Sequence, residues 1–497
     1  MKGSVHYEVR GASALLSIDN PPVNPLSSGV RQGLFDGMTQ ALADDDIKTI
    51  VVTGLNRAFI AGADISEFGA AASEGAGLNQ VLDLMESSTK PVIAAINGTA
   101  FGGGLEVALC CDYRVALATA PLGLPEVKLG LLPGAGGTQR LPRLIGAEAA
   151  IPMIISGNPV PAPAALKMGI VDQVVDDNVV EAALAFAADL ITQGSPTRKI
   201  RDLSDKALAD RNQPDLFTKA AANLDKTHRG QFAPAQILKC IEAAVTLDDF
   251  EAGMAVERTC FAACLGDPQR EALIHIFFAE RAANKIPGLS KDMPLIDVQK
   301  AAVIGAGTMG GGIAMCFANA GIAVQLHDND PEGLKRGLKV IEGNYARTVA
   351  KGRLSQAAMD QRMALIEPAD SLEAFDQADV VVEAVYENLD LKKEIFAKLD
   401  GIMKPGALLA SNTSGLDIDA IAASTSRPEF VCGMHFFSPA NVMRLLEVVR
   451  GAKSSPEALG TAMALGKRLG KVSVMAGNCP GFIGNRMIGG YSRQANL

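Results

Sequence analysis

The sequence predicts an α/β protein with two sheet-containing domains and a helical region between them. Short β-rich runs alternate with helical stretches over about residues 1–190, and the same alternation returns from residue 296. Over residues 191–295 the strand signals fade and helical periodicity remains. The 497 residues also exceed what one hydrophobic core usually holds. We therefore expect domains over 1–190 and 296–479, a helical connector over 191–295, and the start of another helical domain over 480–497.

Each expected element has its own local pattern. In the first domain, strands of a largely buried sheet are expected at the runs 14–19, 49–54, 90–98 and 113–119. In the connector, apolar residues at helical spacing predict helices within 236–266 and 269–285. Proline and glycine at 285–297 predict a hinge before the second domain.

Composition and charge argue against several classes of protein. The net charge of -9 disfavours a nucleic-acid partner, because nucleic acids need a basic surface. No run of about 18 apolar residues is free of charge, so no membrane span is expected. The eight cysteines are scattered without metal-ligand spacing, so we expect reduced, packed thiols and no metal site.

The second domain opens with a dinucleotide-binding fingerprint. An apolar strand, "KAAVI", leads into the turn "GAGTMG", and a helical stretch follows. The next strand, "IAVQLHD", ends in an acid about 20 residues after the first glycine, where a ribose hydroxyl acceptor is needed. The alternative is a glycine-rich turn that is required only for packing and binds no ligand. Together these elements predict a Rossmann domain that binds NAD through Gly305, Gly307, Met309, Gly310 and Asp328.

A histidine and a carboxylate farther along the second domain suit oxidation of an alcohol. Hydride removal requires a base for the hydroxyl proton, and a histidine such as His435 is a residue type suited to that role at neutral pH. Glu447, twelve residues on, is suited to orient the imidazole and stabilise its charged form. For an isolated histidine among aromatic residues, a hydrogen-bonded core residue is the competing interpretation.

Two carboxylates stand out in the first domain. Glu106 follows a glycine run and opens an apolar helix, and Glu126 precedes another glycine run. A carboxylate beside "VALCC" is costly to bury unless it is paired or used. Two such groups can share one water as base and acid, with free backbone N–H groups aimed at an oxyanion. Taken one at a time, each residue also has a structural explanation. Glu106 would then interact with the dipole of its helix, and Glu126 would be an acid on a surface turn.

The dehydrogenase half resembles the L-3-hydroxyacyl-CoA dehydrogenase family. Its signature is carried by "ASNTSGL" at 410–416, "GMHFFSP" at 433–439 and "NCPGFIGNR" at 478–486. The resemblance implies that His435 is the base and Glu447 its partner. It further implies substrate-oxygen donors at Ser414 and Asn485, and contacts to the nicotinamide half of NAD from Glu387 and Lys392.

The first domain is similar to the enoyl-CoA hydratase/isomerase (crotonase) family. The similarity is carried by "AFIAGADISEF" at 58–68, "GGGLEVALCCD" at 102–112 and "PEVKLGLLPGAGGTQRL" at 125–141. It implies a crotonase fold in which Glu106 and Glu126 hold and deliver a water. It also implies that N–H groups of Ala61 and Gly103 hold the thioester oxygen and that Gly134 lies near the water. Hydration is the implied reaction, and a Δ3-to-Δ2 double-bond shift is a second activity left open.

The order crotonase domain, connector and Rossmann domain resembles the bifunctional enzymes of fatty-acid β-oxidation, especially the peroxisomal type. The implied substrates are acyl-CoA thioesters, in the peroxisomal matrix of a eukaryote or the cytoplasm of a bacterium, and a thiolase partner is left open. That family continues beyond "PGFIGNR", so we expect a C-terminally truncated chain with weak or absent dehydrogenase activity. An acyl-CoA isomerase and an acyl-CoA and NAD binding module are the alternatives.

Overall fold

The computed structural model describes residues 2–64, 75–194, 197–283, 285–286, 288, 290 and 293–495. The chain divides into two compact units, Met1–Phe277 and Phe278–Leu497, and each is described by itself. The division falls inside the region expected as a connector. Parts of the motif at 58–68 and of the hinge at 285–297 lie outside the described residues. Among the helices that are described, none is long and apolar enough to cross a membrane.

The first unit is built on a mostly parallel sheet with the strand order β1-β2-β3-β5-β7-β10. Its strands are β1 (Ser4–Arg10), β2 (Ser13–Asp19), β3 (Thr49–Gly54), β5 (Val92–Ile96), β7 (Tyr113–Leu117) and β10 (Gln173–Val175). Only the β1 edge is antiparallel to its neighbour among these strands. The central strands β3 and β5 are buried throughout, as expected of parallel strands covered on both faces.

A second, smaller sheet of the first unit lies beside the glycine-rich turns. It has the order β4-β6-β8-β9 and consists of β4 (Ala58–Ile60), β6 (Thr99–Phe101), β8 (Pro121–Gly123) and β9 (Val160–Pro161). The chain passes directly from β6 into α3 (Gly103–Cys110), and from β8 towards η2 (Glu126–Leu129). Both predicted carboxylates of this unit therefore follow strands of one sheet.

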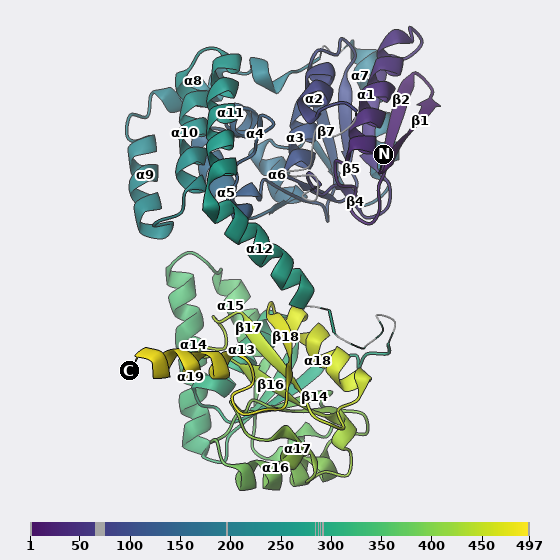
Figure 1. The fold of residues 1–497 in the computed structure, drawn as a ribbon. Coiled ribbons are helices and arrows are strands. Elements are labelled where there is room, and N and C mark those ends of the chain that lie inside the picture. Colours follow the sequence, from purple (N-terminus) through teal and green to yellow (C-terminus); the bar gives the residue numbers. More distant parts are fainter. Residues whose placement is uncertain are drawn as a thin grey trace. The chain divides into compact units, whose positions relative to one another are not determined.

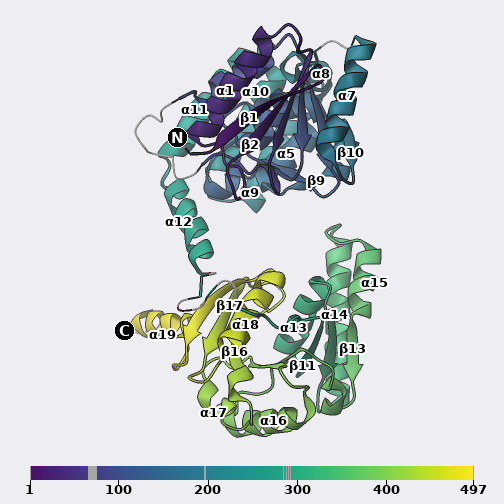
Figure 2. The same ribbon diagram turned by 90° about the vertical axis from the view of Figure 1, so that its right-hand side faces the viewer.

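Helices cover both faces of the main sheet. The face that carries Leu16, Val52 and Ala94 packs against α1 (Ser28–Ala43), α2 (Leu78–Glu86), α3, α4 (Gly137–Ile145) and α5 (Ala147–Ser156). The opposite face, with Val51 and Ile93, packs against α7 (Val179–Gln193). Figure 2 shows α1 and α7 on opposite sides of the sheet. The remaining short elements are α6 (Ala162–Met168) and η3 (Ile200–Asp202).

Most of the region expected as a connector packs into the first unit, as the helices α8 (Asp205–Arg211), α9 (Leu216–Thr227), α10 (Ala233–Thr246) and α11 (Phe250–Gly266). The helix that follows, α12 (Pro268–Ala283), has no buried residue and crosses the boundary between the two units at Phe277. Ile237 and Ile241 of α10 and Cys260 of α11 belong to the same hydrophobic core as the main sheet. In Figure 1, α8 to α11 lie together beside α4 and α5. Residues 205–266 therefore complete the first unit.

The second unit contains a sheet with the order β13-β12-β11-β14-β15-β16-β17-β18. Its strands are β11 (Lys300–Ile304), β12 (Ala323–His327), β13 (Ile366–Ala369), β14 (Val380–Glu383), β15 (Leu408–Ser411), β16 (Val431–Phe436), β17 (Leu445–Arg450) and β18 (Val472–Gly477). The run from β13 to β16 is parallel and has the doubly wound order of dinucleotide-binding sheets. The predicted Rossmann domain is therefore confirmed.

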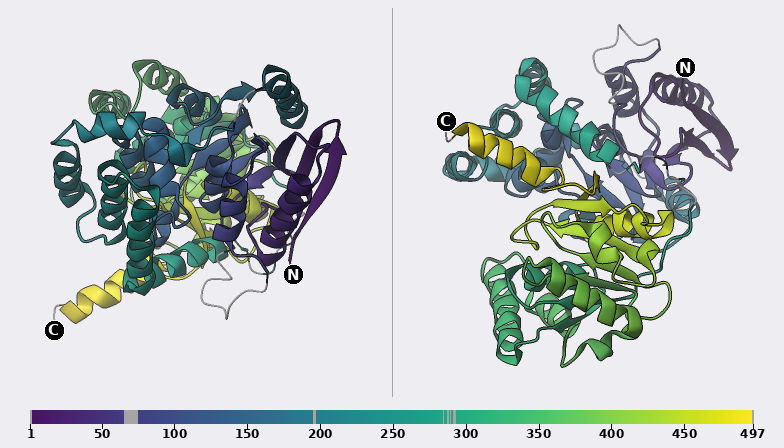
Figure 3. Two further views of the ribbon diagram at one scale, coloured as in Figure 1. Left: turned by 90° about the horizontal axis from the view of Figure 1, so that it is seen from above. Right: turned by 60° about the horizontal axis from the view of Figure 1, so that its bottom comes forward.

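Helices cover both faces of this sheet as well. One core contains α13 (Thr308–Asn319), α14 (Pro331–Ala350), α15 (Gln356–Ala364) and α18 (Pro456–Arg468). The other contains η4 (Leu372–Phe375), α16 (Leu389–Ile402) and α17 (Ile418–Ala422), and η5 (Pro428–Phe430) leads into β16. The last helix, α19 (Gly484–Ala495), has no buried residue and projects from the second unit (Figure 3). The eight cysteines are all described, and all are free.

A buried ion pair anchors α4 to α2 in the first unit. The Arg140 guanidinium donates to both oxygens of Glu86, at 2.8 and 2.7 Å, and both side chains are nearly inaccessible to solvent. Glu86→Gln keeps the shape but leaves the Arg140 charge buried. We expect this variant to lose about 3–5 kcal/mol of unfolding free energy, measured by urea denaturation. Glu332→Gln, which breaks an exposed pair with Lys335, is the control. Equal stability losses in the two variants would contradict the prediction.

Candidate active sites

Glu106 lies in the first turn of α3 and is held by the glycine-rich turn before α4. The residue before the helix, Gly102, has φ +54°, a conformation that favours glycine. Glu106 is 2% exposed, and its Oε1 accepts hydrogen bonds from Ala135 N and Gly137 N, both at 2.8 Å. Burial raises the pKa of Glu106, and the two N–H donors act against that rise. The two donors therefore favour the ionised form of Glu106 and oppose the effect of burial.

Glu126 begins η2 and stands against Gly102. A Cβ at Gly102 would lie 2.7 Å from Glu126 Oε1, so glycine makes room for this carboxyl. Within the described residues, the buried Oε2 of Glu126 has no hydrogen-bond partner. Burial, followed by the charge of Glu106, raises the pKa of Glu126 well above its ordinary value. The structure thus brings the two predicted carboxylates together in unlike environments.

The prediction that Ala61 helps to hold the substrate oxygen is wrong. Its N–H donates to the carbonyl of Val23 at 3.1 Å and is therefore occupied. Gly62 then turns the backbone with φ +111°. Beyond that turn, Ala63 N lies 3.8 Å from the point where a Cβ on Gly103 would stand. The N–H groups of Ala63 and Gly103 are therefore the neighbouring pair, and Gly103 N–H is free of an intrahelical partner because it opens α3.

The turn before α4 contacts a third carboxylate, Glu257 of α11. Glu257 is fully buried, and its Oε1 accepts from Gly136 N at 2.7 Å. Gly134, at the start of this turn, packs against Phe261 on the same helix. The sequence patterns do not single out Glu257. Its spacing from the buried residues Gly253, Met254, Cys260 and Cys264 is nevertheless helical, and that spacing is the signal for a buried acid.

The glycine fingerprint of the second unit has the geometry that a dinucleotide requires. Gly305 follows β11 with φ +98°, and a Cβ there would lie 2.7 Å from Ala384 O. A Cβ on Gly310 would lie 1.7 Å from Gly305 O, so glycine is required for this close approach. Nothing stands within 4 Å of a Cβ on Gly307, which leaves space for a ligand at the start of α13.

A cavity of about 860 Å³ opens at this fingerprint. Gly305, Gly307, Met309 and Asp328 line it, and Gly310 packs behind it. Asp328 Oδ2 accepts from Ala306 N at 2.8 Å, which fixes the carboxylate at the end of β12. The size and the donor set fit a dinucleotide with a free 2′-hydroxyl.

His435 and Glu447 lie on neighbouring antiparallel strands. The register of β16 and β17 places the two residues directly opposite each other, and His435 Nδ1 lies 2.7 Å from Glu447 Oε2. Glu447 Oε1 accepts from Ile483 N at 3.0 Å and from Gly484 N at 2.7 Å. Burial acts to raise the pKa of Glu447, but the hydrogen bonds from His435, Gly484 and Ile483 and the charge of His435 outweigh it and hold the pKa below its ordinary value. An ionised Glu447 therefore orients the imidazole.

The other predicted residues of the second unit form one hydrogen-bonded group. Ser414 Oγ donates to Glu387 Oε1 at 2.9 Å, and Asn485 Nδ2 donates to Ser414 O at 3.2 Å. Lys392 is buried and pairs with Glu383 at 2.7 Å and with Glu387 at 3.5 Å. Sequence reasoning misses Glu383, whose signal is an acid at the end of the apolar strand "VVVE". Neither Glu387 nor Lys392 is among the residues that line the 860 Å³ cavity.

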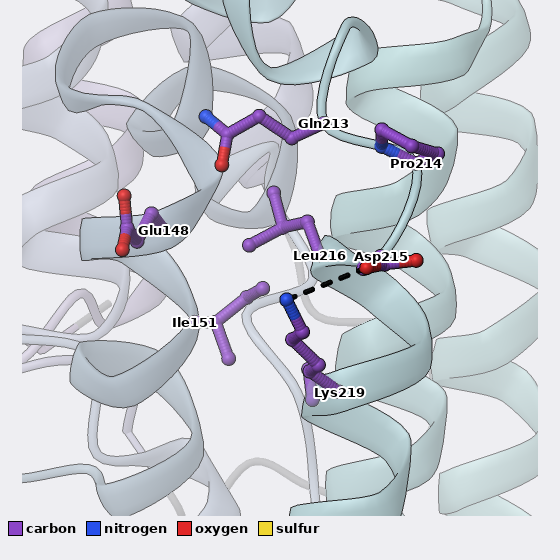
Figure 4. Close-up of a pocket in the computed structure, with 8 residues that line it drawn as sticks. Glu148, Ile151, Gln213, Pro214, Asp215, Leu216 and Lys219 are labelled. Atoms are coloured by element: carbon purple, nitrogen blue, oxygen red, sulfur yellow. Dashed lines mark ion pairs between the residues drawn. The ribbon is translucent and has the colours of Figure 1, made fainter.

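The first unit has another cavity, of about 470 Å³, between α5 and α9 (Figure 4). Glu148, Ile151, Gln213 and Leu216 contribute to its walls, and the dashed line in Figure 4 marks the pair of Lys219 with Asp215 at 3.5 Å. None of the predicted site residues lines it.

Two family models match the chain, one in each unit. The enoyl-CoA hydratase/isomerase model covers residues 8–233. The model of the NAD binding domain of 3-hydroxyacyl-CoA dehydrogenase covers residues 300–479. The predicted crotonase fold and the predicted NAD cofactor are thereby confirmed.

Some related proteins align with both units of this chain in a single match. The peroxisomal bifunctional enzyme of Danio rerio is 45% identical over 99% of this chain and 68% of its own length. The human peroxisomal bifunctional enzyme is 42% identical over the same shares. A solved 3-hydroxybutyryl-CoA dehydrogenase from Escherichia coli K12 is 40% identical, covers 40% of this chain and 42% of its own, and has a TM-score of 0.40. The chain spans about two thirds of the length of the two bifunctional enzymes.

Because Gly310 lies against the Gly305 carbonyl, we expect NAD binding to be sensitive to a side chain at this position. Gly310→Ala forces β11 and α13 apart at the turn, so we expect the Kd for NAD to rise at least about tenfold, or ~1.4 kcal/mol. Gly343→Ala is the matched control, because nothing stands within 4 Å of its Cβ on α14. Titration calorimetry with NAD measures both variants. An unchanged Kd in a folded Gly310→Ala variant would overturn the role given to this turn.

Proposed function

The chain belongs to the family of peroxisomal bifunctional enzymes, and on that premise we propose how its residues divide two reactions. In the first unit, Glu106 and Glu126 add water to a trans-2-enoyl-CoA. In the second unit, His435 and Glu447 serve the oxidation of the resulting (3S)-hydroxyacyl-CoA. The observation that carries the proposal is the pair of carboxyls in unlike environments: Glu106 accepts from two N–H donors, whereas the buried Oε2 of Glu126 has no hydrogen-bond partner among the described residues.

The environments assign a role to each carboxyl in the hydration. Glu106, favoured as the anion, takes a proton from the water, and the oxygen of that water bonds to C3 of the enoyl group. Electrons of the double bond shift to the thioester oxygen, which accepts hydrogen bonds from the N–H groups of Ala63 and Gly103. Glu126, favoured as the protonated acid, gives its proton to C2. The elements of water are then added, and a later proton exchange restores the two carboxyls.

The second unit is suited to remove a proton from the new hydroxyl. Glu447 accepts from Nδ1 of His435, so Nε2 is left as the base, and the charge of Glu447 stabilises the imidazolium. Ser414 and Asn485 lie together and can hold the substrate oxygen. When bound, NAD supplies the hydride acceptor, and the residues placed to hold it are those of the fingerprint and Asp328.

The compartment and the partners are part of the proposal. The relatives named above are peroxisomal enzymes, which supports the peroxisomal matrix for a chain of eukaryotic origin. Acyl-CoA thioesters are the partners that both matched domains support.

Hydration is tested with crotonyl-CoA by the loss of the conjugated-thioester absorbance. We expect Glu106→Gln and Glu126→Gln each to lower kcat about 10²- to 10⁴-fold, because each removes one proton-transfer group. Wild-type kcat should also fall as the pH rises through the raised pKa of Glu126, since the acid form is then lost. Glu148→Gln on α5 is the control for the same chemical change at an exposed site. A folded wild-type chain that leaves crotonyl-CoA unchanged would refute the hydratase assignment.

Oxidation is tested with (3S)-hydroxybutyryl-CoA and NAD by the absorbance of NADH. His435→Asn removes the base, so we expect kcat to fall about 10²- to 10⁴-fold with the Kd for NAD unchanged. His275→Asn on α12, at an exposed site, is the control and should behave like wild type. Equal rates in His435→Asn and wild type would rule out His435 as the base.

A further inference from the structure

Glu257 is a buried carboxylate that has no role in the proposed hydration steps. It lies in the middle of α11 and is 0% exposed. A carboxylate is costly to bury, so its partners have to account for its presence. Those partners all belong to the turn that also holds Glu106.

Four consecutive N–H groups alternate between the two carboxylates. Ala135 N and Gly137 N donate to Glu106 Oε1, both at 2.8 Å. Gly136 N donates to Glu257 Oε1 at 2.7 Å, and Thr138 N donates to Oε2 at 3.2 Å. The turn is therefore held from both sides, and the donors to one carboxylate cannot rotate without breaking those to the other.

The contact with α11 is reinforced by side chains. Thr138 Oγ1 donates to Glu257 Oε2. Gln139 Nε2 donates to Thr138 Oγ1 at 3.1 Å and to the Cys240 carbonyl of α10 at 2.9 Å. Gly253, one turn before Glu257, allows the Gln139 side chain to approach, because a Cβ there would lie 2.2 Å from Oε1. The helices completing the first unit thus reach its proposed catalytic turn directly.

We propose that Glu257 is a positioning residue of the hydration site, which fixes residues 135–138 so that two of their N–H groups face Glu106. This inference rests on the proposed hydration at Glu106 and Glu126. When ionised, Glu257 suits this role because both of its oxygens accept, and the turn presents donors to each. A carboxamide offers only one accepting atom, so its NH₂ group would meet an N–H of the turn.

Glu257 also influences the protons of the site through its charge. The titratable and charged groups that face it are Glu106 of α3, Glu126 of η2, Arg140 of α4, and Cys240 of α10, which lies beside Cys260. Burial, followed by the charge of Glu106, raises the pKa of Glu257 to about 8. When ionised, Glu257 adds to the rise in the pKa of Glu126. Removing this negative charge lowers the pKa of Glu126, so the acid form is lost at a lower pH.

The test is Glu257→Gln in the full chain, assayed with crotonyl-CoA over a range of pH. We expect kcat to fall about 10- to 100-fold, as a misplaced catalytic group would cause. KM should stay unchanged, because the N–H groups of Ala63 and Gly103 are untouched. The alkaline limit of the rate should move to lower pH. Glu242→Gln on α10, at an exposed site, is the control.

Two results would overturn the proposal. One is a folded Glu257→Gln variant with kcat within twofold of wild type. The other is a fall in kcat without a shift of the alkaline limit, which indicates a structural role alone. If Glu257→Gln does not fold, the Thr138→Val variant tests the positioning role instead. It removes the hydroxyl that contacts Glu257 and Gln139 but keeps the Glu257 carboxylate and the backbone N–H groups, and we expect kcat to fall about threefold to tenfold at constant KM. An unchanged kcat in that variant would equally overturn the proposal.

Failure of the proposed function is recognised separately. Wild type and Glu106→Gln are assayed beside the Glu257 variant. If wild type does not hydrate crotonyl-CoA, the function assigned to the first unit is wrong. If wild type is active and Glu106→Gln is not, an active Glu257→Gln variant rejects only the positioning role.

Discussion

Backbone N–H groups of glycine-containing turns hold the carboxylates on which the proposed sites of both units depend. In the first unit, Ala135 and Gly137 donate to Glu106. In the second, Ile483 and Gly484 donate to Glu447, and Ala306 donates to Asp328. A backbone donor stabilises a carboxylate without adding a formal charge, so the carboxylate keeps its own charge for substrate, imidazole or ribose. It is also more rigid than a lysine or arginine side chain.

This arrangement is available only where the backbone comes close to a side chain. A Cβ at Gly102 or Gly137 would lie less than 3 Å from an oxygen of Glu126 or Glu106. At Gly310 the crowding involves the Gly305 carbonyl, and it brings α13 against β11. Since any larger residue would displace the carboxyl or the helix, these glycines determine the geometry of the two proposed sites.

The arrangement of elements explains how one chain supports two kinds of proton transfer. The proposed hydration site combines a carboxyl bonded to two N–H groups with one whose buried Oε2 has no hydrogen-bond partner among the described residues, so their proton affinities differ. The second unit pairs a histidine with an ionised carboxylate across two strands, which sets the tautomer. Residues 205–266 add a third carboxylate to the first unit through Glu257 and so join the helical region to the chemistry proposed there.

Much of the molecule was predictable from its sequence. The fingerprint from Gly305 to Asp328, the acids Glu106 and Glu126, and the pair His435 and Glu447 were all found because they lie in short local motifs. Local patterns also identified the buried strands and the helices of residues 236–285. Contacts between groups that are distant in the sequence could be identified only from the tertiary structure. Ala61 gives way to Ala63 because a turn at Gly62 redirects the N–H groups. Glu257 reaches residues 135–138 only because α11 packs against α4, a contact between segments about 120 residues apart that no local pattern specifies.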